Sequence, residues 1–107
     1  MKKGMIKVSV IYPNTDGKKF DTNYYTSKHL ELVGSLLGDS LKGASVDSGI
    51  GGGAPGAPAP FIAMGNMYFD SVEAFQQAFG PNAEKIMGDL PNFTDIEPII
   101  QISEVVV

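Results

Sequence analysis

Apolar and polar residues follow two different periods along the first part of the chain. Between Met5 and Tyr12, apolar residues stand at every second position, with Lys7 and Ser9 between them. This pattern predicts a β-strand with one buried face. From residue 21 to about residue 38 the steps change to three and four, which predicts an amphipathic helix. Its apolar stripe consists of Tyr25, His29, Leu32, Val33 and Leu36.

The start of this helix carries a specific signal. Residues 13–17 are rich in turn-forming residues and end the strand. Asp21 can then accept hydrogen bonds from free backbone N–H groups, and Phe20 can pack on Tyr25 as a hydrophobic staple. The single histidine, His29, lies on the apolar stripe, so we expect it to face the interior.

The middle of the chain contains an irregular segment between two predicted strands. Residues 41–50 show a weak pattern that is compatible with a short edge strand. Residues 49–60 are rich in glycine and proline, which disfavour a helix and a central strand, so they predict a long loop. The apolar run 61–69 that follows predicts a central strand covered on both faces.

A second helix and a last strand complete the pattern. Asp70 or Ser71 can cap the helix, and Glu73 would complete a capping box with Asp70. Its buried stripe is expected to comprise Val72, Phe75 and Phe79. Gly80-Pro81 ends it, and a short helix through residues 86–87 leads to a final strand over residues 95–107, which are rich in isoleucine and valine.

The order of these elements is β-α-β-β-α-β. It predicts an α+β, ferredoxin-like fold, in which two helices cover one face of a four-stranded antiparallel sheet, as a single domain over residues 1–107. Residues 61–64 and 99–100 would offer apolar side chains to both faces of that sheet. We therefore expect an apolar patch on the face without helices, and a homodimer in which two such faces pack as a dimeric α+β barrel.

Composition excludes several classes of function. The chain has 107 residues and a net charge of −4, which gives no cationic surface for nucleic acid or anionic lipid. It has no cysteine and one histidine, so thiolate chemistry, disulfides and multi-histidine metal centres are excluded. No apolar stretch is long enough for a signal peptide core or a membrane span, so we expect a cytoplasmic protein without a membrane partner.

Two segments carry a resemblance to a known family. Phe20-Asp21-x-x-Tyr24-Tyr25-x-x-x-His29 follows a strand that ends in Tyr12-Pro13, and the segment 91–95 leads into Pro98 and Gln101-Ile102. Together they resemble the EthD family of the dimeric α+β barrel superfamily, over almost the whole chain. Many members carry a proline two residues after the histidine, where this chain has Glu31, and the loop 49–60 is unusually long.

The resemblance implies a small-molecule pocket without naming a reaction. Superfamily relatives include cofactor-free quinone-forming monooxygenases, lactone isomerases and polyketide cyclases. The chain would then need no cofactor and would bind a small apolar or aromatic ligand.

His29 is the first candidate for chemistry, because an imidazole can act as general acid or base near neutral pH. Tyr25 lies one helical turn earlier and Tyr24 beside it, so a phenol could orient the ring or a bound oxyanion. The alternative is a buried structural histidine. A metal site needs three or four ligands, which argues against a metal at His29, and an axial haem role is a further, disfavoured alternative.

Three other features are weaker candidates. Tyr68 and Asp95 could contribute to substrate binding in the same pocket, or could serve only as a core residue and a turn carboxylate. The glycines of residues 51–56 fit a dinucleotide-binding spacing but run into prolines and a strand, not a helix. A flap over the pocket of the same or the partner subunit is the better functional interpretation of that loop, and the alternative is a plain mobile connection.

Two hypotheses of function remain. In the first, the protein is a cofactor-free enzyme, an oxidoreductase or isomerase, that oxygenates, isomerises or cyclises an aromatic, polyketide-like or other mostly apolar metabolite. His29 would move a proton while Tyr25 stabilises negative charge. In the second, the same pocket only binds a ligand, and the protein is an accessory factor of a degradative pathway.

Overall fold

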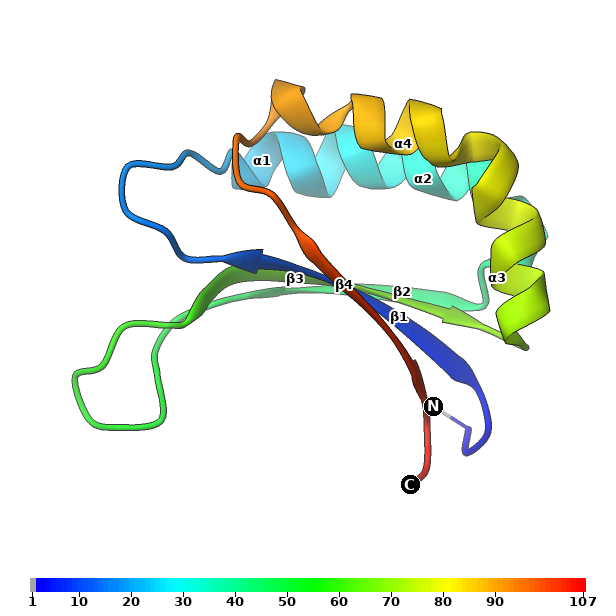
Figure 1. Cartoon of the computed structure of the whole chain (residues 1–107), viewed down its shortest axis with the longest axis horizontal. Coiled ribbons are helices and arrows are strands. Elements are labelled where there is room, and N and C mark those ends of the chain that lie inside the picture. The colour runs from blue at the N-terminus through cyan, green and yellow to red at the C-terminus, as the bar shows by residue number, and fades with distance from the viewer. Residues whose placement is uncertain (1) are drawn as a thin grey trace.

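The computed structural model describes residues 2–107. Four antiparallel strands form one sheet in the order β2-β3-β1-β4. Their bounds are Ile6–Pro13 for β1, Gly43–Ser48 for β2, Phe61–Phe69 for β3 and Ile99–Glu104 for β4. All helices lie on the same side of this sheet, and the segment before β1 lies beside the C-terminal segment, where Gly4 N donates to Val105 O at 2.7 Å (Figure 1). The predicted ferredoxin-like architecture is confirmed.

The first helical segment begins as the sequence predicts. Asp21 caps α1 (Thr22–Tyr24) by accepting a hydrogen bond of 3.1 Å from the backbone N–H of Tyr24. Phe20 packs edge-on against Tyr25, with ring centroids 5.2 Å apart, as expected for a hydrophobic staple. The chain then continues through a π-helical turn, Tyr25–His29, into α2 (Leu30–Leu37), which ends at Gly38 with a positive φ.

The second helical segment begins at one of the two predicted caps, and it departs from the prediction at the capping box with Asp70 and at Val72. Ser71, and not Asp70, caps α3 (Val72–Phe79), because its hydroxyl accepts from the N–H of Ala74. Val72 therefore begins the helix on its outer side and is 36% exposed, while Phe75 is buried as expected. A 3-10 turn at Gly80–Asn82 then redirects the chain into α4 (Ala83–Gly88).

The last strand is shorter than the predicted range of 95–107. Thr94 makes an isolated bridge with Phe20, and its hydroxyl donates to the backbone carbonyl of Lys19 at 2.6 Å. Pro98 has no N–H to donate to a neighbouring strand. Residues 95–98 consequently run as an irregular connection, and β4 begins only at Ile99.

The side of the sheet that faces the helices is apolar. Tyr12 pairs with Ala63, Val10 with Gly65 and Val8 with Met67, so these side chains share one face. Together with side chains from the helices, the side chains on this face of the sheet form two hydrophobic clusters. The apolar cluster contains Val8, Val33, Leu37, Phe69, Phe75 and Ile86. The aromatic cluster contains Tyr12, Tyr25, Ala63, Phe93 and Ile96.

The face without helices is more polar than predicted. Its middle row is Ser45, Asn66, Ser9 and Gln101. The amide of Asn66 donates to Ser45 Oγ at 3.2 Å and to Asp47 Oδ2 at 3.0 Å. Apolar side chains occupy only one neighbouring row, in which Met64, Ile11 and Ile99 lie side by side. The expected apolar patch thus covers one end of this face, since strand alternation sends Ile100 to the helix side.

The loop 49–60 projects beyond the end of the sheet (Figure 1). It is held by a hydrogen bond from Gly52 N to Ala57 O at 2.9 Å, and the amide of Asn14 donates to Ala59 O at 2.9 Å. None of its residues lines the cavity described below. In this conformation the loop therefore does not cover the pocket of its own subunit.

Candidate functional site

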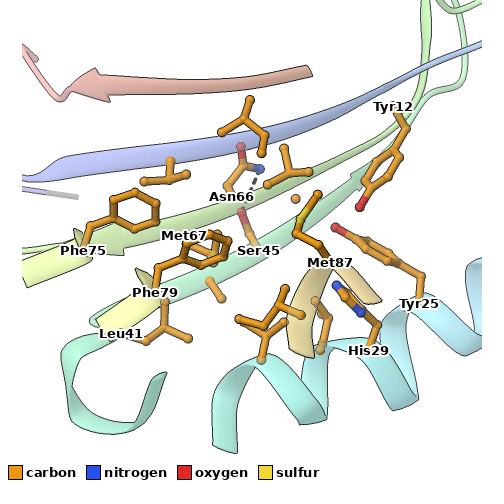
Figure 2. Close-up of a pocket in the computed structure, with 18 residues that line it drawn as sticks. Tyr12, Tyr25, His29, Leu41, Ser45, Asn66, Met67, Phe75, Phe79 and Met87 are labelled. Atoms are coloured by element: carbon orange, nitrogen blue, oxygen red, sulfur yellow. Dashed lines mark hydrogen bonds between the residues drawn. The ribbon is translucent and has the colours of Figure 1, made fainter. Parts of the chain in front are cut away.

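A cavity of about 220 Å³ lies between the sheet and the helices. Figure 2 shows that Phe75 and Phe79 lie at one end, while Tyr12, Tyr25 and His29 gather at the other. Most of the remaining lining is aliphatic or methionine, and none of the lining residues is Lys, Arg, Asp or Glu. Met87 and Ile100, which also line it, are 37% and 46% exposed. The cavity is therefore largely apolar, with two phenols and an imidazole at one end and with Ser45 and Asn66 in its lining on the sheet side.

The π-helical turn carries two of the polar lining residues at its ends. The backbone N–H of Leu30 bonds to the carbonyl of Tyr25, one residue further back than in an α-helix. The hydroxyl of Thr26 donates to the Thr22 carbonyl at 2.9 Å, a contact of the kind that perturbs regular helix geometry. The rings of Tyr25 and His29 stack, with centroids 5.5 Å apart and planes 17° apart. Both side chains are buried.

His29 is oriented by a carboxylate from the other helical segment. Its Nδ1 lies 2.9 Å from Oδ2 of Asp89, directly after α4. The carboxylate accepts the Nδ1 proton, so Nε2 is the basic nitrogen of neutral His29. Nε2 makes no hydrogen bond within residues 2–107. The geometry is that of an imidazole prepared to exchange a proton with a ligand in the cavity.

Asp89 is itself held in place by three donors. Its Oδ1 accepts from Tyr24 Oη at 2.8 Å and from Asn92 Nδ2 at 2.9 Å. Burial raises the pKa of Asp89, but the hydrogen bonds from Asn92, His29 and Tyr24 outweigh burial and leave the pKa below its usual value. Asp89 is therefore ionised at neutral pH and can stabilise a positive charge on His29.

Tyr12 and Tyr25 direct their hydroxyls toward each other at the polar end of the cavity (Figure 2). Their ring centroids are 5.5 Å apart and the planes are nearly perpendicular. Burial raises the pKa of Tyr25 to about 12. Burial also raises the pKa of Tyr12, and the neighbouring Tyr25 raises it further. Both phenols remain protonated at neutral pH.

A glycine makes this position of Tyr25 possible. A Cβ atom added at Gly65 on β3 would overlap the Tyr25 hydroxyl, so only glycine lets the phenol approach the sheet this closely. Phe93 closes the aromatic cluster from the other side and is fully buried. Its ring centroid lies 4.8 Å from that of His29 and 5.1 Å from that of Tyr25.

The structure places the five predicted site residues in different environments. His29 and Tyr25 line the cavity together. Tyr24 does not line it but bonds to Asp89, and that hydrogen bond raises the pKa of Tyr24.

Tyr68 and Asp95 do not share the pocket, which corrects the sequence-based prediction. Tyr68 pairs with Lys7 on the face without helices, because it lies an odd number of residues from Ala63, Gly65 and Met67. Asp95 is exposed and accepts the backbone N–H of Lys19 at 2.8 Å. That backbone hydrogen bond lowers the pKa of Asp95. The turn-carboxylate interpretation of Asp95 is the one that the geometry supports.

Sequence reasoning missed Asp89, Tyr12 and Gly65. Asp89 lies 60 positions from His29 and belongs to no motif at that spacing. The sequence pattern identified Tyr12 only as the last inward-facing residue of a predicted strand. The structure adds that this side chain lines the cavity with its hydroxyl. Gly65 interrupts the apolar run 61–69, and an isolated glycine inside a strand can signal a close approach by another group.

Neither a metal site nor a membrane span is found in the part of the chain that the structure describes. No three His, Asp or Glu residues there are grouped so that they could hold a metal ion. The helices of residues 2–107 are too short or too polar to cross a bilayer.

The comparison with protein families settles the assignment. The model of the EthD domain matches residues 13–97, which are most of the chain and include all of the elements that build the cavity except β1 and β4. The chain belongs to the EthD family. None of the curated proteins compared with this EthD domain matches it.

Solved structures show the same fold. An EthD-like protein from Ralstonia eutropha is 45% identical, with a TM-score of 0.92, and the match covers 99% of this chain and 96% of that one. An ethyl tert-butyl ether D (EthD) family protein from Bacillus halodurans is 24% identical, with a TM-score of 0.64 over 94% of this chain and 97% of that one. A protein of unknown function from Bacteroides fragilis, described as dimeric and ferredoxin-like, is 13% identical, with a TM-score of 0.58 over 97% and 99%.

Proposed function

We propose that this EthD domain is a cofactor-free enzyme that binds a small, mostly apolar molecule in the cavity and uses His29 as general acid and base. The observation that carries the proposal is the 2.9 Å contact between His29 Nδ1 and the carboxylate of Asp89. His29 itself also lines the apolar cavity. A histidine with only a packing role would not need a carboxylate held by Tyr24 and Asn92. This arrangement supports proton transfer at Nε2.

The division of roles follows from the contacts. His29 removes a proton from the ligand at Nε2 and can return it at another atom, which suits an isomerisation or a cyclisation. Asp89 is a positioning residue that selects the tautomer and stabilises the imidazolium. Tyr25 stacks on His29 and can donate a hydrogen bond to negative charge that develops on the ligand. An oxygenation would use the same proton removal, followed by reaction of the carbanion with molecular oxygen.

The size of the cavity limits the ligand. At roughly 30 Å³ for each water-sized group, the cavity of about 220 Å³ holds about seven such groups, which limits the ligand to one small ring system with few substituents. That is below the range of drug-sized ligand sites. The apolar lining and the two phenylalanines at the far end favour a flat hydrocarbon body.

We also propose that the functional unit is a homodimer. The edge strand β4 exposes Ile99, Ile100 and Ile102 at 53%, 46% and 45%. A solved structure with this fold is described as dimeric. Analytical sedimentation at micromolar concentration tests the proposal, because a stable species of 11.4 kDa would overturn it.

A general-base reaction on a small flat probe tests the enzymatic proposal. The probe is 5-nitrobenzisoxazole. When a base removes its ring C–H proton, the electron pair forms a nitrile, the ring N–O bond breaks, and the oxygen becomes a coloured phenolate. We expect wild-type protein to accelerate this elimination, His29→Gln to lose at least about tenfold in rate, and the matched control Tyr68→Phe to behave as wild type.

Each outcome decides between the enzyme and the ligand carrier. If His29→Gln binds the probe and reacts as fast as the wild type, the acid–base role of His29 is wrong. Binding of the probe without acceleration by the wild type would support the non-catalytic accessory protein. Absence of binding would overturn the cavity as the functional site.

A further inference from the structure

The polar end of the cavity contains two phenols that come from different elements. Tyr12 lies near the end of β1, and Tyr25 begins the π-helical turn. Their hydroxyls meet beside the ring of His29 (Figure 2). The backbone has been shaped to allow this meeting, because any side chain at Gly65 would displace the Tyr25 hydroxyl.

The hydrogen bonding of this pair leaves a donor unused. The two hydroxyls face each other, and no hydrogen bond joins them in the structure (Figure 2). Two phenols bring two O–H donors, and even a bond between the hydroxyls would use only one of these donors. The remaining proton can point into the cavity. When a ligand oxygen arrives, both phenols can donate to it.

We propose that Tyr12 and Tyr25 form an oxyanion-binding pair, so that the ligand is a small planar molecule with a phenolic or enolisable carbonyl oxygen held between these two hydroxyls and near His29. The inference rests on the proposed function and adds to it a second donor and a chemical class of ligand. Tyr12 becomes a catalytic residue that touches the reacting oxygen.

The charges around the cavity favour a ligand that enters neutral. No charged side chain of the acidic, lysine or arginine type lines the cavity, so a permanent cation or a phosphate would lose its hydration without a counter-charge. A neutral enol, ketone or phenol does not have this cost, because it carries no net charge whose hydration would be lost. Negative charge then forms only after binding, at the position of the two phenols.

The step is balanced within the site. His29 Nε2 takes a proton from the ligand, either from the carbon next to the carbonyl or from the phenol oxygen. The C–H or O–H bond breaks, and its electron pair ends on the ligand oxygen. The site then contains an imidazolium beside Asp89 and an oxyanion beside two O–H donors. Both phenols keep their protons, because their pKa values lie above the usual value for tyrosine.

Binding of 4-nitrophenol and nitrobenzene separates the oxyanion contact from the fit to the cavity. The two probes share a nitro-substituted ring and differ in the hydroxyl. We expect wild type to bind 4-nitrophenol in its coloured phenolate form at pH values at which the free compound is neutral. Tyr12→Phe and Tyr25→Phe should each weaken 4-nitrophenol binding about 10- to 100-fold, and change nitrobenzene binding by less than about twofold.

Tyr68→Phe is the matched control, since it removes a hydroxyl from a buried tyrosine on the opposite face of the sheet. It should leave both affinities at the wild-type level. If 4-nitrophenol binds no tighter than nitrobenzene, or if Tyr12→Phe weakens both compounds equally, the oxyanion pair is wrong while the cavity remains a ligand site. If neither compound binds to the wild type, the proposed function itself fails.

Discussion

The apolar cluster and the aromatic cluster lie side by side between the same sheet and helices but differ in chemistry. The apolar cluster is built from aliphatic side chains and two phenylalanines, and Phe69 at its centre is fully buried. The aromatic cluster is equally well buried, yet it includes Tyr12 and Tyr25, and His29 packs against its Phe93. Two hydroxyls are thus kept where phenylalanine would pack as well.

The two clusters differ in what their side chains contribute: the apolar cluster contributes stability alone, whereas the aromatic cluster also contains polar groups. Burying a hydroxyl costs free energy unless a partner compensates it. In the apolar cluster the chain avoids that cost completely. In the aromatic cluster two hydroxyls are buried despite this cost in free energy, and a glycine in the central strand leaves room for Tyr25. Local choices that do not favour stability are expected at functional sites, and they agree with the proposed ligand site.

The largest expected effects come from removing a ring from either cluster. Phe69→Ala and Phe93→Ala should each lower the free energy of unfolding by about 3–5 kcal/mol, because both rings are fully buried and leave a cavity. Urea denaturation measures both. Equal losses would show that the clusters contribute alike to stability, and a loss below about 1 kcal/mol at Phe93 would contradict its place in the core.

Milder variants at the same positions separate packing from function. In Phe69→Leu and Phe93→Leu the protein should still fold. Only Phe93→Leu should reduce the elimination of 5-nitrobenzisoxazole, because only Phe93 contacts both His29 and Tyr25. Equal reductions at both positions would mean that the apolar cluster also shapes the reacting groups.

Gly65→Ala should produce the next largest effect. The new methyl group overlaps the Tyr25 hydroxyl and forces the phenol away from the sheet, at a cost of about 1–3 kcal/mol in stability. Binding of 4-nitrophenol should fall together with stability. The double variant with Tyr25→Phe removes the clashing oxygen and should recover stability but not 4-nitrophenol binding. Recovery of both would contradict a donor role for Tyr25.

Asp89→Asn should have a smaller effect on stability, of about 1 kcal/mol, and a clear effect on chemistry. The folded-state pKa of Asp89 lies below its unfolded value, so the ionised form contributes stability above about pH 4 and loses it as the pH falls through the lowered pKa. The difference between wild type and variant should therefore close in acid. Urea denaturation from pH 7 downward checks this. A difference that persists in strong acid would mean that Asp89 acts by packing alone.

The same variant tests the positioning role. Without the carboxylate, Nδ1 of His29 loses its anionic partner and the imidazolium becomes less stable. The rate of probe elimination should fall, and the pH at which the rate reaches half its maximum should shift to lower values. A purely structural role would lower the rate without moving the pH profile.

Alkaline titration examines the aromatic cluster without a substitution. Tyr25 has a pKa of about 12 in the folded protein, against 10.0 for an ordinary tyrosine. Folding stability supplied by the neutral phenol is complete below pH 10 and is lost as the pH rises through 12. Tyrosinate absorbance should show this late ionisation, and Tyr25→Phe should remove the part of it that belongs to Tyr25, while Tyr12 keeps its own raised pKa. A titration of Tyr25 near 10 would contradict its burial.

The smallest effect is expected at Asp95. Asp95→Asn removes a surface carboxylate that accepts a hydrogen bond from the Lys19 backbone and does not line the cavity. Binding of 4-nitrophenol should match the wild type within experimental error. A measurable loss would restore Asp95 as a site residue.

Much of the fold could be predicted because its signals are local. The period of two in β1, the Asp21 cap and the Phe20 staple involve residues within five positions of each other. The π-helical turn was not predictable in this way, since no pattern of apolar residues distinguishes it from an α-helix. The assignment of Tyr68 to the pocket was wrong because a central strand that is apolar throughout does not reveal which side chains face the helices.

The sequence by itself determined the order of elements, the inward stripe with Tyr25 and His29, and the family to which they belong. These follow from neighbours along the chain, through backbone periodicity and capping. Tertiary structure alone decided that Asp89 meets His29 across 60 positions, that Tyr12 joins Tyr25, and that Gly65 makes room for the pair. Such contacts depend on the strand register and on the packing of one helix against another, and the chemistry of the site arises from them.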